Sequence, residues 1–162
     1  MEKDNKRRKI FLNCLKSILI ILIFSKLVPQ VLTEDPIYSY VMMKLPKGNA
    51  LKFYNRGIPG PNEIHINGNI ENVRSPYVFD FTKEENNVTL IWKNSITDCG
   101  GMFKDCEYIL EMDFTHFYTS HATKMADMFL NCKRLKSLDL SNFDTSKVSY
   151  PMHNMFWNCY EL

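Results

Sequence analysis

Apolar positions recur at fixed spacing in the C-terminal part of the chain. A pattern with apolar residues at offsets 0, 3, 4, 7 and 10 is written three times, at nearly constant intervals. The copies comprise Cys99, Met102, Phe103, Cys106 and Ile109, then Met125, Met128, Phe129, Cys132 and Leu135, and then Met152, Met155, Phe156, Cys159 and Leu162. The period of about 26 residues predicts stacked structural repeats, because arrays of this kind have periods of roughly 20 to 50 residues.

The spacing within a copy predicts the elements of one repeat. At about 100° per residue the five apolar positions fall within an arc of about 120°, which is one face of an α-helix. In the following SLDLSNF, Leu138 and Leu140 alternate with polar residues as in a β-strand. Since a lone helix and strand cannot bury this face, the pattern predicts an α/β repeat solenoid over residues 95–162, with a helix and a short strand in each repeat.

The phrase MFLNCKRLKSLDLSNFDTSKV resembles the BspA-like leucine-rich repeats of microbial surface proteins, in which MF, C, L, LDLS-F and DTS recur at about this period. The first copy departs from it in reading MDFTHFYTS, and the third has one extra residue near Tyr150. The resemblance implies a secreted or surface-displayed solenoid that acts in adhesion or partner binding, with no catalytic residue. The predicted repeat core is Met102, Phe103, Cys106, Ile109, Met125, Met128, Phe129, Cys132, Leu135, Leu138, Leu140, Phe143, Met155, Phe156 and Cys159.

The N-terminal segment has the pattern of a targeting signal. A basic cluster from Lys6 to Lys9 precedes an apolar run that is densest from Ile18 to Phe24. We interpret residues 1–33 as a signal peptide whose cleavage leaves a chain starting near Glu34. The alternative is an uncleaved signal anchor, which would be the chain's membrane contact. Either reading predicts a secreted or cell-surface protein.

Residues 34–94 differ in character, since Pro and Gly punctuate short β-rich runs. Candidate strands are 40–45, 50–54, 63–67, 77–81 and 88–92, and residues 88–94 are also a candidate for the strand of an incomplete repeat. About 60 residues are marginal for an independent core. We therefore expect a β-rich N-terminal cap on the repeats.

Charge and motifs exclude several classes of function. Without the seven Lys/Arg and two Asp/Glu of residues 1–33, the totals of 20 and 18 become 13 and 16, so no basic footprint for nucleic acid remains. No phosphate loop, nucleophile elbow or metal-binding Cys spacing occurs, and we expect neither a cofactor nor a metal. The repeat cysteines are expected to be buried free thiols. Asn87 begins a sequon for N-glycosylation.

The function expected from the sequence is non-enzymatic recognition of a protein or glycan at a cell surface. One alternative is an anchored structural component without a ligand. The other is an enzyme with a site in residues 34–94, for which His65 and Asp80 are the candidates. Because the third copy would expose apolar surface, further repeats or a partner are expected to cover the C-terminal end.

Overall fold

The computed structural model describes residues 38–56, 59–72 and 77–162, which belong to one compact unit. The predicted signal segment and its cleavage site lie outside the described residues. The elements are β1 (Ser39–Lys52), β2 (Glu63–Ile66), β3 (Asn69–Ile70), β4 (Val78–Trp92), β5 (Glu111–Asp113) and β6 (Ser137–Asp139). No described segment is a helix that is long and apolar enough to cross a membrane.

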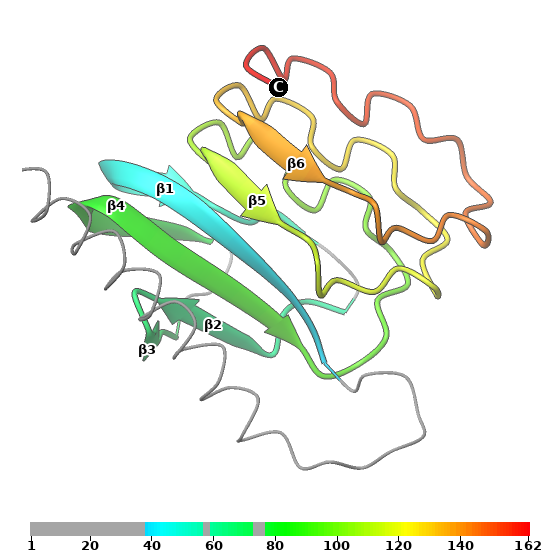
Figure 1. Ribbon diagram of the computed structural model, residues 1–162, viewed down its shortest axis with the longest axis horizontal. Helices are drawn as coiled ribbons and strands as arrows, with labels where there is room; N and C mark the ends of the chain where they lie inside the picture. The colour runs from blue at the N-terminus through cyan, green and yellow to red at the C-terminus, as the bar shows by residue number, and fades with distance from the viewer. Residues whose placement is uncertain (1–37, 57–58, 73–76) are drawn as a thin grey trace, which may run out of the picture. The chain divides into compact units, whose positions relative to one another are not determined.

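All six strands form one sheet, in the order β3-β2-β4-β1-β5-β6 (Figure 1). The long strands β1 and β4 pair antiparallel, and β1 alternates buried Val41, Met43 and Leu45 with more exposed residues. This period-two burial keeps one face of the sheet apolar. Asn67 and Gly68 both have positive φ, at 53° and 87°, and form the tight turn between β2 and β3 that Asn-Gly pairs favour.

The repeats continue this sheet. Strand β5 pairs antiparallel with β1, and β6 pairs parallel with β5. Met112 faces Leu138 in the register, so the two strands are offset by one full period of the sequence pattern. The strand predicted in the SLDLSNF segment is therefore present, although it is only three residues long.

The predicted helices are wrong, and with them the α/β solenoid. The residues that the structure describes form an all-strand mixed sheet without helices, and the apolar pattern lies in three turn segments, 98–110, 124–136 and 150–162. Each segment contains two residues with φ near +60°, four positions apart: Gly101 and Asp105, then Asp127 and Asn131, then Asn154 and Asn158. Such left-handed residues interrupt any right-handed helix.

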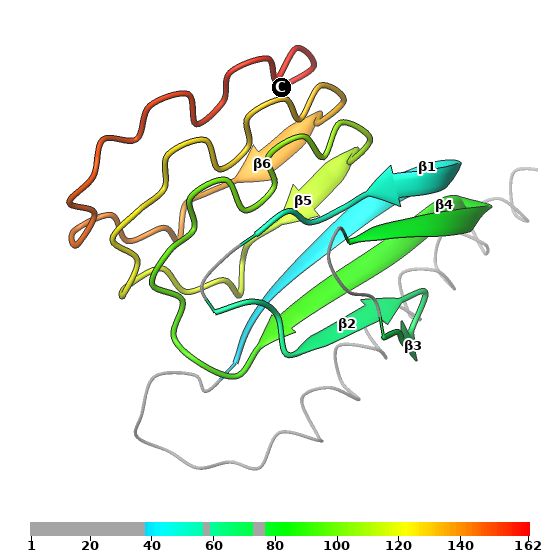
Figure 2. The ribbon, with the colours of Figure 1, turned by 180° about the vertical axis from the view of Figure 1, so that it is seen from behind.

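Backbone hydrogen bonds explain why turns replace helices. The amides of Gly101, Phe103 and Asp105 donate to carbonyls of the second turn segment at 2.8–2.9 Å. The intervening amides of Met102 and Lys104 instead close short turns within their own segment, each at 3.1 Å. Alternate amides thus bind the neighbouring repeat, and the turn segments run side by side (Figure 2).

The strand boundaries also differ from those predicted in residues 34–94. The predicted strands 40–45 and 50–54 lie largely within the continuous β1, and 77–81 and 88–92 lie largely within β4. Residues 88–92 pair antiparallel with β1 and β2, whereas the neighbour of β5 is β1. The interpretation of residues 88–94 as the strand of an incomplete repeat is therefore wrong.

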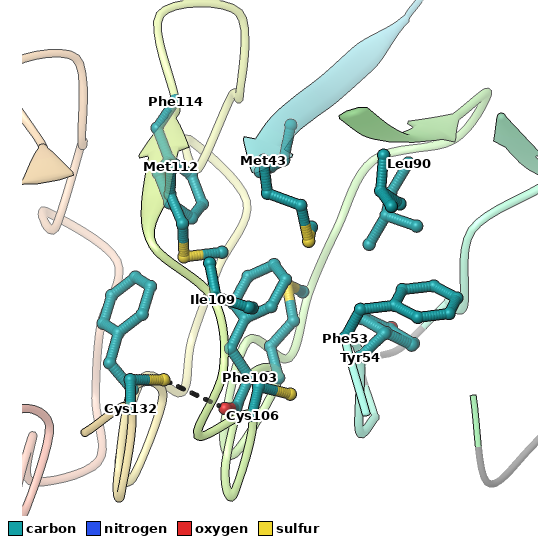
Figure 3. Packing of buried hydrophobic residues seen from close by; sticks show 14 of the residues in the cluster. Met43, Phe53, Tyr54, Leu90, Phe103, Cys106, Ile109, Met112, Phe114 and Cys132 are labelled. Carbon is teal, nitrogen blue, oxygen red and sulfur yellow. Dashed lines mark hydrogen bonds between the residues drawn. The ribbon is translucent and has the colours of Figure 1, made fainter. Parts of the chain in front are cut away.

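The core lies between the sheet and the turn segments. Met43 and Leu90 from the sheet point toward Phe103 and Cys106 from the first turn segment (Figure 3). The repeat phenylalanines form a stack, in which Phe129 lies parallel to Phe103 with ring centroids 5.8 Å apart. These stacked rings connect the three repeats through the core.

The expected core residues differ in burial from one repeat to the next. Those of the first two turn segments are fully buried: Met102, Phe103, Cys106, Ile109, Met125, Met128, Phe129, Cys132 and Leu135. Those that are partly buried are Leu138, Leu140, Phe143, Met155 and Cys159. Phe156 is 43% exposed and Trp157 is 62% exposed, so the third turn segment presents apolar surface to solvent.

The segment after β1, residues 53–56, closes the other side of the repeats. The Asn55 amide donates to the Met102 carbonyl at 2.8 Å, and the Asn55 side chain donates to the Gly101 carbonyl at 3.0 Å. Arg56 Nε donates to the Gly100 carbonyl at 3.0 Å. The Asn55 amide and the Arg56 side chain therefore bond the carbonyls of Met102 and Gly100, whose equivalents Met128 and Ala126 accept amides of the preceding repeat.

A candidate ligand-binding hollow across three repeats

A polar hollow of about 520 Å³ opens where the three turn segments begin. The side chains that line it include Asn55, Arg56, Asp98, Lys104, Asp105, Lys124, Asp127, Tyr150 and His153. Its wall therefore combines the closing segment after β1 with side chains from each of the three repeats. We call this feature the polar hollow.

One column of side chains in the polar hollow follows the repeat period. Asp98 and Lys124 occupy the same position in successive repeats and form a parallel β-bridge, and Tyr150 follows in the third repeat, next to its extra residue. Lys124 Nζ lies 3.6 Å from Asp98 Oδ2 and 5.0 Å from the centre of the Tyr150 ring. The ammonium thus joins an ion pair to a cation–π contact across three repeats.

Asp98 is held in place by its own backbone surroundings. It is 8% exposed, and its Oδ1 accepts the Gly100 amide at 2.8 Å. A Cβ at position 100 would lie only 2.9 Å from that oxygen, so glycine permits the close approach. Arg56 reinforces the turn by donating to the Gly100 carbonyl. This corner of the polar hollow is therefore fixed before any ligand arrives.

Asp127 holds an acceptor atom without a donor. Its Oδ2 lies 3.3 Å from Lys104 Nζ, and its Oδ1 lies 4.0 Å from His153 Nε2, which is too long for a hydrogen bond. Oδ1 is buried and accepts no hydrogen bond from any residue that the structure describes. A buried carboxylate oxygen in this state gains free energy when a donor is supplied.

The charges of the polar hollow balance. Three cations, from Arg56, Lys104 and Lys124, face three carboxylates, from Asp98, Asp105 and Asp127. The hollow can therefore donate and accept hydrogen bonds without a strong preference for a charged ligand. Among the described residues, no cluster of three or more His, Cys, Asp or Glu side chains is placed to hold a metal ion.

The cysteines lie away from the polar hollow, in the core. All four described cysteines are free, and the Cys132 thiol donates to the Phe103 carbonyl at 3.2 Å (Figure 3). The Cys159 thiol donates to the Phe129 carbonyl at 3.1 Å, one repeat later. Burial raises the pKa of the Cys99 thiol to about 12 and that of Cys106 well above its usual value. These thiols therefore stay protonated at neutral pH.

The structure does not bring the alternative enzyme residues together in the polar hollow. His65 on β2 pairs with Glu63 at 3.1 Å, and Asp80 on β4 accepts the Ala50 amide at 2.7 Å. Ala50 has a positive φ of 50°, so the Asp80 contact supports a strained turn in β1. Asn87 is exposed on β4. Its carbonyl accepts the Asn67 amide at 2.8 Å, and its own amide donates to the Asn67 side-chain oxygen at 3.1 Å.

Sequence reasoning did not select the residues of the polar hollow, because the search followed apolar positions. The polar positions repeat as well: Gly101, Asp127 and Asn154 occupy one repeat position, and Asp105, Asn131 and Asn158 occupy another. All are residue types that tolerate positive φ. That recurrence could have revealed both the turns and the columns that they place in register.

The fold and the hollow define a repeat protein built on a mixed β-sheet. A family model described as "Mycoplasma protein of unknown function, DUF285" matches residues 74–162, which is more than half of the chain. The chain belongs to this family. No curated protein and no solved structure matches it.

Proposed function

We propose that this is an exported, non-enzymatic cell-surface protein that recognises a protein or glycan ligand through its repeats. The resemblance of residues 128–148 to BspA-like surface repeats supports this function. So does the basic and then apolar pattern of residues 1–33, which is the proposed route of export and the proposed membrane contact.

The observation that carries the proposal is the polar hollow. Three successive repeats contribute side chains to it, and backbone hydrogen bonds between repeats fix their register. A concave site with converging donors and acceptors is typical of ligand binding. Its walls are pre-formed, which lowers the entropic cost of binding.

Two exposed lysines offer a matched test. Lys124 lies in the polar hollow and pairs with Asp98, whereas Lys133 lies outside it and pairs with Glu107 at 2.9 Å. Their side chains are 44% and 42% exposed, although Asp98 is more buried than Glu107, at 12% against 39%, so the urea midpoint of each variant is measured beside its binding.

The experiment screens the full chain against immobilised host-surface proteins and a glycan array. We expect Lys124→Ala to weaken binding about tenfold and Lys133→Ala to change it less than about twofold. No binding to any surface would favour the passive structural component. If both variants retain full binding, the ligand binds outside the polar hollow.

Export is tested separately, by mass spectrometry of the N-terminus of the protein recovered from outside the cell. A mature chain that begins near Glu34 is the expected result. An intact Met1 on membrane-bound protein would instead indicate the signal anchor, and protein found only inside the cell would contradict export.

A further inference from the structure

We propose that the ligand of the polar hollow is a neutral sugar ring that carries adjacent hydroxyl groups. This inference rests on the proposed function and specifies its ligand. Three features of the hollow lead to it, namely its charge balance, its partly exposed Asp127 carboxylate beside Lys104 and its exposed aromatic rim.

Charge balance disfavours ionic ligands. Lys104 and Lys124 are each already paired with a carboxylate, Asp127 and Asp98 respectively. A phosphate or a carboxylate ligand that binds either lysine would have to displace the aspartate from it. A cationic ligand would meet the ammonium groups at short range. A neutral ligand leaves both ion pairs intact.

The hydrogen-bonding groups suit vicinal hydroxyls. Each hydroxyl can donate one hydrogen bond and accept others. The Asp127 side chain is 25% exposed, so its carboxylate can accept a hydrogen bond, while Lys104 Nζ, 3.3 Å from Asp127 Oδ2, can donate one. One hydroxyl can therefore donate to the exposed part of the Asp127 carboxylate while its neighbour accepts from Lys104; the buried Oδ1 is not reached from the hollow. Arg56 uses Nε for the Gly100 carbonyl and has further guanidinium N–H groups.

Tyr150 supplies an apolar surface at the rim. Its side chain is among the exposed large aromatic residues, at 57%, and the centre of its ring lies 5.0 Å from Nζ of Lys124, which pairs with Asp98. A sugar ring has an apolar C–H face that can pack on such a ring, and an aromatic side chain loses little entropy on binding. The volume of about 520 Å³ lies within the range of roughly 300–1,000 Å³ found for small-molecule sites.

The variants for the test follow from the geometry. Asp127→Asn removes the charge, and the backbone tolerates it because Asn154 takes the same repeat position with a φ of 53°. Tyr150→Ala removes the aromatic ring at the rim. Tyr108, a tyrosine of 43% exposure outside the hollow, provides the matched control as Tyr108→Ala. Circular dichroism and the urea midpoint of each variant establish that it is folded.

Saturation-transfer NMR on the full chain would use a panel of neutral hexoses and N-acetylhexosamines, with glucuronic acid and inorganic phosphate as charged probes. We expect neutral sugars to bind, Asp127→Asn and Tyr150→Ala to weaken binding about tenfold, and Tyr108→Ala to leave it unchanged. Raising the salt from about 0.1 to 0.5 M should change the affinity less than about twofold, because no net charge is neutralised.

The outcomes separate this inference from the proposed function. Binding of the charged probes alone, with a steep salt dependence, would overturn the neutral sugar. The same holds if Tyr150→Ala and Tyr108→Ala have equal effects. Binding of an immobilised protein that Lys124→Ala abolishes, without binding of any sugar, would overturn this inference and leave the proposed function standing. Absence of binding in both experiments would refute both.

Discussion

Removing Phe129 tests the central packing of the repeats. Phe129 is fully buried, lies parallel to Phe103 and Phe156 with centroids 5.8 and 5.6 Å away, and meets the edge of Phe114 at 5.5 Å. Phe129→Ala leaves a cavity between two stacked rings and removes three aromatic contacts. We expect the free energy of unfolding to fall by about 3–5 kcal/mol.

Phe156 provides the comparison within the same stack. It occupies the equivalent repeat position but is 43% exposed and has one stacked neighbour. Because about half of its surface remains in water, Phe156→Ala should cost only about 1–2 kcal/mol. A total stability of about 5–15 kcal/mol makes the larger loss a substantial fraction of the whole.

The assay is a urea titration of the full chain followed by circular dichroism. The slope of the free energy against urea concentration should be the same for each variant and the wild type, which checks for two-state behaviour. The two variants should differ by at least about 1 kcal/mol. Equal losses, or a loss below about 1 kcal/mol for Phe129→Ala, would show that the phenylalanine stack does not hold the repeats together.

Three further predictions concern the backbone, a buried hydroxyl and the thiols. Asn131 has a φ of 63°, and its side chain donates to Asp105 at 2.6 Å. Both Asn131→Ala and Asn131→Gly remove this hydrogen bond, but alanine is strained at positive φ, so it should destabilise the fold by about 1–2 kcal/mol more than glycine. Equal losses in urea titrations would exclude backbone strain as the cause. Tyr54 has a buried hydroxyl with no partner among the described residues, and burial raises its pKa. Tyr54→Phe should therefore leave the free energy of unfolding unchanged or raise it by about 1 kcal/mol. A loss of more than about 1 kcal/mol would show that the hydroxyl is hydrogen-bonded. The folded-state pKa of the Cys99 thiol, about 12, exceeds its ordinary value of 9.0, so the unfolded chain releases that proton first and stability should fall as pH rises above about 9. Cys99→Ala should reduce this fall between urea titrations at pH 7 and pH 10, and an unchanged fall would contradict the assignment.

The sequence by itself determined the repeat period and its register. Met112 and Leu138 hold equivalent positions in successive repeats and face each other in the parallel pair of β5 and β6. The stack of Phe103, Phe129 and Phe156 follows the same spacing. A repeated pattern fixes which residues are equivalent, and stacking then places equivalent residues side by side.

Only the tertiary structure decided which conformation the repeats adopt. Apolar offsets of 0, 3, 4 and 7 suit one face of a helix, but they also suit the turn segments observed here. Positive φ at Asp105 and Asn131, and amides that bond to the neighbouring repeat, select the turns. A helix would use those amides internally, so that backbone hydrogen bonds would join the repeats through their strands alone.

The polar hollow likewise depends on contacts between distant parts of the chain. Arg56 reaches the Gly100 carbonyl across 44 residues, and Lys124 connects Asp98 with Tyr150 from two other repeats. Hydrophobic periodicity predicts which side chains leave water, because the free energy gained by burial is roughly proportional to the apolar area removed from water and does not depend on direction. Hydrogen bonds and ion pairs depend on distance and angle, so their partners became defined only when the repeats stacked against the closing segment.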